Sequence, residues 1–150
     1  MALRPDRNEH LTDLSFFMNE TAERGVIVTA ATQGSGAAMD DSTAAVNIAN
    51  AVTDKPVGLL LNDVVNLDLT RQHINYAKDE VQKGSKVLLL RRGFVVTDQI
   101  SGAITMGEPA HWMGGGQLCS ATANSASVQV GRWLSKKDAD GFAKVEINIV

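Results

Sequence analysis

Residues 84–112, GSKVLLLRRGFVVTDQISGAITMGEPAHW, decide the fold of this 150-residue chain. Their first half contains the apolar run Val87, Leu88, Leu89 and Leu90, which is too short for a buried helix of ordinary length. A glycine interrupts the run, and the residues that follow alternate between apolar and polar. Short apolar runs that are rich in Val and Ile and punctuated by glycine are typical of strands and turns. The stretch therefore predicts the central strands of a small sheet.

The second half of this stretch contains two predicted extended pieces. Phe94, Val96 and Ile100 continue on one side of the alternating pattern after the glycine. Residues 101–102, Ser-Gly, predict a turn. A second extended piece is expected to run through residues 104–106 and to end at the glycine and proline that follow.

Further strands are predicted outside this stretch, at residues 26–28, 46–48, 59–61, 128–135 and 142–150. Residues 59–61 are leucines on both alternating faces, which predicts a strand that is buried on both sides. At the end of the chain, Val145, Ile147 and Ile149 face one way and polar residues face the other. This alternation is typical of a half-buried strand.

Two segments stay ambiguous from the sequence alone. Residues 14–18 can form a strand, or a helix that Thr12 or Asp13 would cap. Residues 66–83 carry apolar side chains at helical spacing but also fit an irregular extended structure, and we expect the extended form. Together the patterns predict a mainly β protein, a small single-domain β-barrel or sandwich with few or no helices. We expect a flexible polar N-terminal arm over residues 1–10 and a β-rich domain over residues 11–150.

The composition narrows the classes of function. Apolar residues make up 44% of the chain and charged residues 21%, as in ordinary globular proteins. A net charge of −3 speaks against a nucleic-acid partner, which normally requires a basic face. The N-terminus has no apolar core of signal-peptide length, and no run approaches the ~20 apolar residues that span a bilayer. The single cysteine, Cys119, forms no internal disulfide, so we expect a protein that stays in a reducing cytoplasm and not a secreted one.

No residue pattern predicts catalysis, a metal or a cofactor. Residues 34–36, Gly-Ser-Gly, lack the further signature of a phosphate loop and predict a surface loop. Asp138 and Asp140 begin like a calcium loop, but the later acidic ligand is missing, so residues 136–141 predict a charged tight turn. The acidic pair at residues 40–41 is expected to be a solvated turn.

The remaining reactive side chains also have simpler interpretations. His10, His73 and His111 are scattered without zinc-ligand spacing, and His111 is expected to pack or to form a hydrogen bond. Cys119 has no base nearby in the sequence and is expected to be a buried, inert thiol. The two tryptophans, at positions 112 and 133, could form a platform for a sugar, although aromatic content is only 5%. We therefore expect no enzyme.

One apolar patch is a candidate contact surface, formed by Leu11, Leu14, Phe16, Phe17 and Met18. It either docks on the core of its own domain or grips a partner chain.

The order of several segments resembles the cement, or decoration, proteins of tailed-phage capsids. The segments that carry the resemblance are FFMNETAERGVIV (16–28), KPVGLLLNDVVNLDLTRQHIN (55–75), GSKVLLLRRGFVVTDQISG (84–102), GEPAHW (107–112) and VGRWLSKKDADGFAKVEINIV (130–150). They cover most of the chain after the polar arm, and none of them is a catalytic signature.

This resemblance implies a β-rich protein, commonly a homotrimer, on the outer surface of the expanded virion capsid. Its implied partners are the major capsid protein, whose neighbouring subunits it would clamp against the pressure of packaged DNA, and copies of itself. The host cytoplasm would be its location during assembly. The N-terminal arm could add a strand to a sheet edge of a neighbour. A different class stays open, namely a phage tail or fibre module that binds a carbohydrate or receptor.

Overall fold

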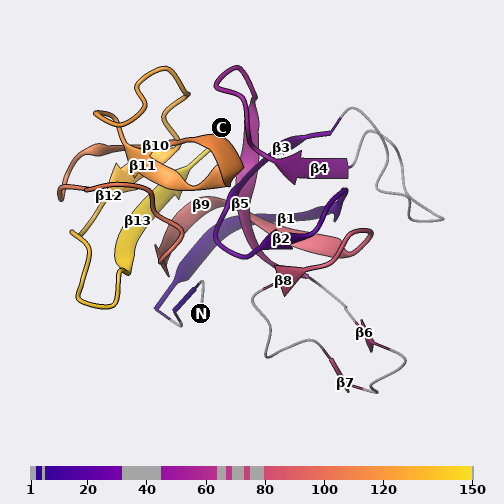
Figure 1. Ribbon diagram of the computed structural model, residues 1–150. Coiled ribbons are helices and arrows are strands. Elements are labelled where there is room, and N and C mark those ends of the chain that lie inside the picture. The colour runs from indigo at the N-terminus through magenta and orange to yellow at the C-terminus, as the bar shows by residue number, and fades with distance from the viewer. Residues whose placement is uncertain are drawn as a thin grey trace.

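The computed structural model describes residues 3–4, 6–31, 45–63, 67–68, 73–74 and 80–149. Strands dominate these residues, which confirms the predicted mainly β fold (Figure 1). The elements are β1 (Asn8–Met18), β2 (Ala22–Glu23), β3 (Ile27–Ala30), β4 (Ala45–Ile48), β5 (Pro56–Asp63), β6 (Leu67–Asp68), β7 (His73–Ile74), β8 (Glu80–Val81), β9 (Lys86–Thr97), β10 (Pro109–Trp112), the 3-10 turn η2 (Gly114–Gly116), β11 (Leu118–Ser120), β12 (Gly131–Trp133) and β13 (Ala143–Asn148).

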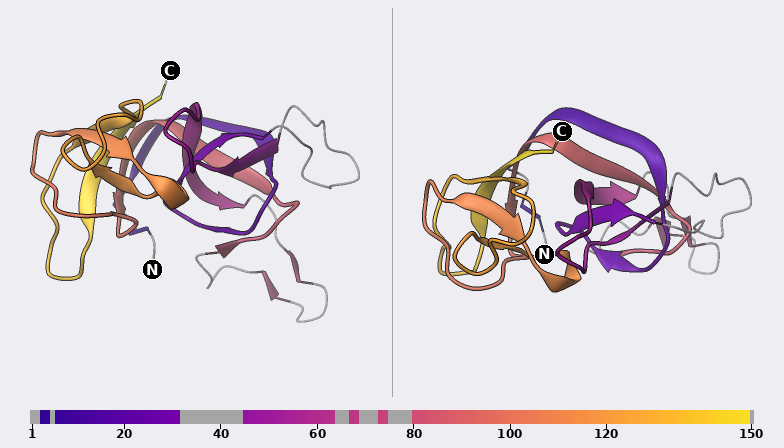
Figure 2. Two further views of the ribbon diagram at one scale, coloured as in Figure 1. Left: turned by 45° about the horizontal axis from the view of Figure 1, so that its top comes forward. Right: turned by 90° about the horizontal axis from the view of Figure 1, so that it is seen from above.

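Nine of these strands form one sheet in the order β1-β4-β3-β5-β9-β13-β12-β10-β11. Strand β1 also pairs with β9, so the pairings of β1, β4, β3, β5 and β9 return to their starting strand. Seen from above in Figure 2, β1 is the outermost strand and curves beside β9 along the length of the molecule. The two short pairs β2–β8 and β6–β7 lie outside the main sheet.

Strand β9 joins the two halves of the molecule. Its first half lies between β1 and β5, and its second half lies between β1 and β13. All three pairings of β9 are antiparallel. The pairing with β13 runs from Thr97 opposite Ala143 to Arg92 opposite Asn148. The prediction that residues 84–112 hold the central strand is therefore confirmed.

Two hydrophobic cores lie on opposite sides of one shared wall of strands. Leu60 of β5 points into the core that also contains Met18, Val28, Val46 and Leu89. Its neighbours Leu59 and Leu61 point into the other core, which contains Trp112 and Trp133. All three leucines of residues 59–61 have 0% exposure, so the prediction of a strand buried on both faces is confirmed.

The prediction that Phe94 and Val96 lie on the same side as Ile100 is wrong. Val95 is buried in the same core as Ile100, whereas Phe94 and Val96 are half-buried. The pairing of β9 with β1 slips by one residue beside Arg91. Such a bulge turns the following side chains to the opposite face of the sheet, which local alternation does not reveal.

The second extended piece, which the sequence predicts at residues 104–106, also lies elsewhere. Residues 103–105 belong to no strand, and Met106 is 70% exposed. The strand is instead β10, which begins at Pro109, a position where a missing N–H is tolerated. Gly107 turns the chain into it with φ 89°.

The other predicted elements fall where the patterns place them or outside the described residues. Residues 14–18, which the sequence left open, belong to strand β1. Strand β13 has alternating buried and exposed residues, as the pattern at the end of the chain predicts. The described parts of residues 66–83 include the short strands β6, β7 and β8, as the expected extended form predicts. The loop at 34–36 and the acidic pair at 40–41 lie outside the described residues.

The described part of residues 1–10 contacts the domain. Leu3 forms a bridge to Thr97 at the end of β9 and is only 6% exposed within the core of Trp112 and Trp133. The Arg4 N–H donates a hydrogen bond to the Val96 carbonyl oxygen over 2.9 Å. Strand β1 already begins at Asn8. An apolar side chain near the N-terminus thus packs in the core, and the free arm over residues 1–10 stays a prediction that the Leu3→Ala variant tests.

Candidate functional site

The structure divides the predicted apolar patch into exposed and buried residues. Leu11 and Leu14 are 47% and 49% exposed on β1. Phe16 and Phe17 are half-buried, and Phe16 packs against the core inside the ring of strands. Met18 has 0% exposure and lies in the core of its own domain, which is one of the two alternatives that the sequence left open for the patch. The exposed apolar residues of the patch are therefore the two leucines.

The first part of β1 has a neighbour on one side only. It pairs with β9 from Asn8 to Phe17, whereas β4 reaches only Phe17 and Met18 on its other side. Within the described residues, no strand covers the outer edge of β1 from Asn8 to Phe16. Figure 2 shows this strand at the outside of the molecule. An open sheet edge presents unpaired N–H and C=O groups, so it is a potential contact for an extended chain.

A local hydrogen bond closes part of that edge. The Asp13 carboxylate accepts hydrogen bonds from the Ser15 N–H, over 2.8 Å, and from the Ser15 hydroxyl. The hydroxyl contact has the largest effect and holds the pKa of Asp13 below its usual range, against the opposing effect of desolvation. The Ser15 N–H and nearby Arg91 contribute in the same direction as the hydroxyl. Because the Ser15 N–H is already bonded, the part of this edge without a strand neighbour among the described residues runs from Asn8 to Asp13.

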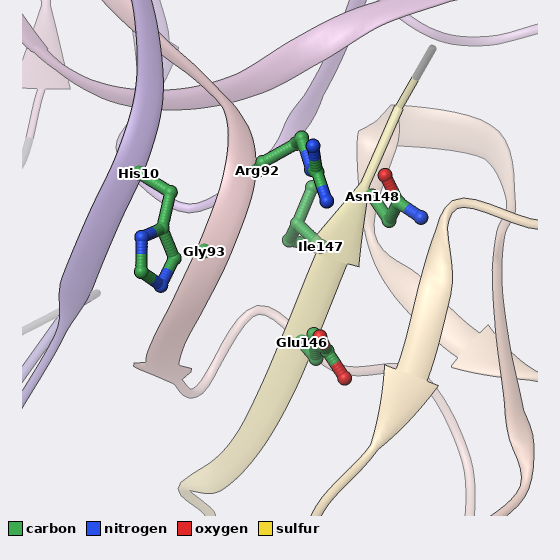
Figure 3. A pocket seen from close by; sticks show the side chains of 6 residues that line it. All are labelled: His10, Arg92, Gly93, Glu146, Ile147 and Asn148. Carbon is green, nitrogen blue, oxygen red and sulfur yellow. The ribbon is translucent and has the colours of Figure 1, made fainter.

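A polar pocket of about 310 Å³ lies on the outer face of β1, β9 and β13 (Figure 3). Its lining residues are His10, Arg92, Gly93, Glu146, Ile147 and Asn148. In Figure 3 the His10 ring lies beside Gly93. A Cβ at Gly93, where φ is 144°, would overlap the Asn8 carbonyl oxygen. The glycine is therefore explained by the close approach of β1.

The polar side chains of this pocket are exposed. This holds for His10, Arg92, Glu146 and Asn148. Catalytic and ligand pockets usually bury a few converging polar groups among apolar walls. The pocket therefore has the character of a hydrated depression between strands.

The two tryptophans are core residues. Trp112 and Trp133 have 0% exposure, and the Trp133 Nε1–H donates a hydrogen bond to the Cys119 carbonyl oxygen over 3.3 Å. Neither ring has a free face on which a sugar could stack. The two tryptophans therefore cannot form the sugar-binding platform that a carbohydrate-binding tail or fibre module would need.

The remaining candidate side chains have structural roles. The His111 Nδ1 lies 2.8 Å from the Ser127 carbonyl oxygen, as expected for a hydrogen-bonding residue. Cys119 is buried and free, and burial raises the pKa of its thiol, which keeps it protonated and unreactive at neutral pH. His73 lies on β7, and its side chain is outside the described part of the structure.

The acidic turn after β12 binds an arginine of the N-terminal segment. The Arg4 guanidinium lies 2.8 Å from the Asp140 carboxylate and 3.6 Å from that of Asp138, and its carbon is 4.3 Å from the centre of the Phe142 ring. The Asp138 carboxylate also accepts hydrogen bonds from the N–H groups of Asp140 and Phe142. Both carboxylates are therefore used by the fold, and the prediction of a charged tight turn is confirmed.

The described residues contain no group of three or more His, Cys, Asp or Glu side chains that could hold a metal ion. None of the described helical segments has the length and hydropathy that crossing a membrane requires.

The sequence indicates the exposed leucines but neither the pocket nor the edge of β1 that has no strand neighbour among the described residues. Both features depend on the pairing of β9 with β1 and with β13, strands that are far apart in the chain. No local pattern signals such a pairing, because edges and pockets between strands depend on which strands become neighbours.

The model of a family described as structural cement protein (E217 gp24/Pam3 gp6) matches residues 11–148. No curated protein matches the chain. The family match covers nearly the whole chain and agrees with the resemblance that the segment order indicates.

Proposed function

Because the chain belongs to the family of phage structural cement proteins, we propose that it binds the outer surface of the expanded phage head and clamps neighbouring subunits of the major capsid protein. Membership of this family makes it a structural phage protein, implies association with capsid proteins, and describes no enzyme. The family match carries the proposal. In this proposal the chain is held in the host cytoplasm until heads have expanded.

The exposed leucines of β1 support a contact with the capsid. Leu11 and Leu14 are about half exposed on the outermost strand of the molecule (Figure 2). Burying the rest of each side chain would contribute about 1 kcal/mol, half of the value for a full leucine burial. The polar outer face of β13, with Glu146 and Asn148 exposed, fits the side that stays in water.

Cement binding stabilises a capsid by mass action. A protein that binds the expanded lattice, and not the procapsid or its dissociated subunits, shifts the equilibrium toward the expanded form. Many copies act on the same shell, so a modest affinity per copy is sufficient. The head would then withstand a higher internal pressure from DNA.

The proposal includes a homotrimer, which is supported by the resemblance to capsid decoration proteins. Two further exposed apolar residues are available for contacts between copies, namely Met106 at 70% and Val128 at 56% exposure. They lie on the β9–β10 and β11–β12 connections, away from strand β1 in the sequence. Light scattering of the purified protein measures its mass directly, and three times the mass of the chain supports the trimer.

Binding to expanded heads that lack cement tests the function. We expect the wild-type chain to sediment with such heads and to raise the temperature at which they release DNA. Replacing both Leu11 and Leu14 by serine should lower the affinity by about 2 kcal/mol, or roughly 30-fold. Val52→Ser is the matched control, because Val52 is 45% exposed but lies in the β4–β5 connection. Absence of binding by the wild-type chain would refute the proposed function, and equal loss in both variants would refute the assignment to β1.

A further inference from the structure

We propose that the N-terminal strap, defined here as Leu3, Arg4 and Asp6, opens and closes on the folded domain as a separate unit, and that salt shifts it toward the open form. In the closed form the strap contacts the end of β9 and the turn before β13. In the open form the strands stay paired and the strap is a free polar arm. Opening is a property of the isolated chain and does not depend on the proposed function.

A break in the strand pairing separates the strap from β1. Leu3 forms a bridge to Thr97, and Asn8 lies opposite Phe94 at the start of β1. Leu3 and Asn8 are five positions apart, whereas Thr97 and Phe94 are three positions apart. The strap and β1 therefore do not form one regular ladder, in which both separations would be equal. Opening of the strap breaks the bridge and leaves the pair of Asn8 with Phe94 intact.

The buried contacts of the strap come from its first two residues. Leu3 packs in the core that contains the two tryptophans, and the Arg4 N–H donates a hydrogen bond to the Val96 carbonyl oxygen over 2.9 Å. Asp6 is exposed. Ordering each residue of such a segment costs conformational entropy, so the gain from one buried leucine and one hydrogen bond exceeds this cost by little. The strap should therefore open far more often than the sheet unfolds.

Ion pairs with the domain add a contribution that depends on salt. The Arg4 guanidinium lies 2.8 Å from the Asp140 carboxylate and 3.6 Å from that of Asp138, and the Lys144 ammonium lies 3.6 Å from the Asp6 carboxylate. Each of these five side chains is at least one-third exposed. Because salt screens exposed pairs of this kind, a higher ionic strength favours the open form.

The surface that receives the strap is held in shape by contacts of the domain itself. The Asp138 carboxylate accepts hydrogen bonds from the N–H groups of Asp140 and Phe142, over 3.0 and 2.8 Å. The Lys144 Nζ lies 3.9 Å from the centre of the Phe94 ring. None of these contacts uses an atom of the strap, so opening requires no rearrangement of the turn or of β13.

Native-state hydrogen exchange at low urea concentrations tests the inference. The Arg4 amide reports on the strap, and the Leu60 amide, which donates to the Val26 carbonyl oxygen, reports on unfolding of the sheet. We expect the Arg4 amide to be protected, but at least about 100-fold less than the Leu60 amide. Exchange at Arg4 should depend only weakly on urea, because opening exposes little surface, whereas exchange at Leu60 should rise steeply.

Salt and one carboxylate variant test the role of charge. Raising the NaCl concentration from about 0.02 to about 0.5 M should speed exchange at Arg4 by about threefold. Asp140→Asn should cause a similar increase at low salt and should reduce the effect of salt, because the Asp140 carboxylate contacts Arg4. Glu146→Gln is the matched control, since it removes an equal charge from an exposed position on β13 outside the ion pairs of the strap.

The possible results differ clearly. Equal protection and equal urea dependence of the Arg4 and Leu60 amides would show that the strap opens only when the whole domain unfolds, which overturns the proposal. Exchange at Arg4 at the rate of an unstructured peptide would show that the strap has no closed form. Exchange that does not respond to salt, or that rises equally in Asp140→Asn and Glu146→Gln, would refute the role of the ion pairs.

Discussion

Replacing Leu3 by alanine tests whether the N-terminal segment is part of the fold. Leu3 is only 6% exposed and lies in the core that contains Trp112 and Trp133. Buried Leu→Ala replacements destabilise by about 2–5 kcal/mol. The low end, about 2 kcal/mol, applies here because a segment near the chain end can relax into the space. For a domain of this size the melting temperature falls by about 2–4 °C per kcal/mol, so we expect a decrease of about 4–8 °C.

Thermal unfolding followed by circular dichroism measures this decrease, with urea unfolding as a second measure. Leu14→Ala is the control, because this leucine lies on the same N-terminal part of the chain but is 49% exposed. Its melting temperature should change by no more than about 2 °C. If Leu3→Ala melts at the temperature of the wild type, the conclusion that Leu3 packs in the core is wrong. Residues 1–10 would then behave as the free arm that the sequence predicts.

Four further predictions concern the core, a glycine, the thiol and one carboxylate. Leu89→Asp should prevent soluble folding, because it places an unpaired charge at a position of 0% exposure; a soluble variant with a cooperative melt would contradict this. Gly93→Ala should destabilise more than Gly84→Ala, because both positions have positive φ but only at Gly93 does a Cβ overlap the backbone; equal melting temperatures would refute the explanation. Cys119 should react with a thiol reagent only after unfolding, and fast labelling of the native protein would show that the buried position is wrong. The pKa of Asp13 is lowered in the folded state, so its contribution to stability is present above pH ~4 and is lost as the pH falls through the folded pKa. The difference in melting temperature between wild type and Asp13→Asn should therefore shrink in acid, and a constant difference down to about pH 2 would contradict the prediction.

Docking of the N-terminal segment depends partly on charge. Arg4 contacts Asp138 and Asp140, and Lys144 lies 3.6 Å from the Asp6 carboxylate. Ion pairs as exposed as these contribute little stability and are screened by salt. The buried Leu3 side chain and the backbone hydrogen bond of Arg4 therefore account for most of the docking.

Local patterns predicted the strands that carry their signal within a few residues. The leucines 59–61 indicate burial on both faces without any knowledge of the neighbouring strands. The alternation at the end of the chain predicts β13 and its buried face in the same way. Strand β11 (Leu118–Ser120) was missed, because three residues that include a cysteine and a serine are too few for a period to be recognised.

The candidate site was predicted only in part. Sequence analysis identified Leu11 and Leu14 as members of an apolar patch, but it grouped them with Met18, which is a core residue. An apolar side chain has the same appearance in the sequence whether it faces the core or solvent. Packing decided the exposure: Met18 lies in one core with Val46 and Leu60, whereas Leu11 and Leu14 belong to neither core.

The sequence by itself determined the class of the fold, the main strands and, through the order of its segments, the family. These properties depend on hydrophobic period, turn residues and composition, which act over short distances along the chain. The tertiary structure decided the bulge beside Arg91, the place of Leu3 in the core and the open edge of β1. Each of these follows from contacts between residues far apart in the sequence, and a shift of one residue in pairing changes which face is buried.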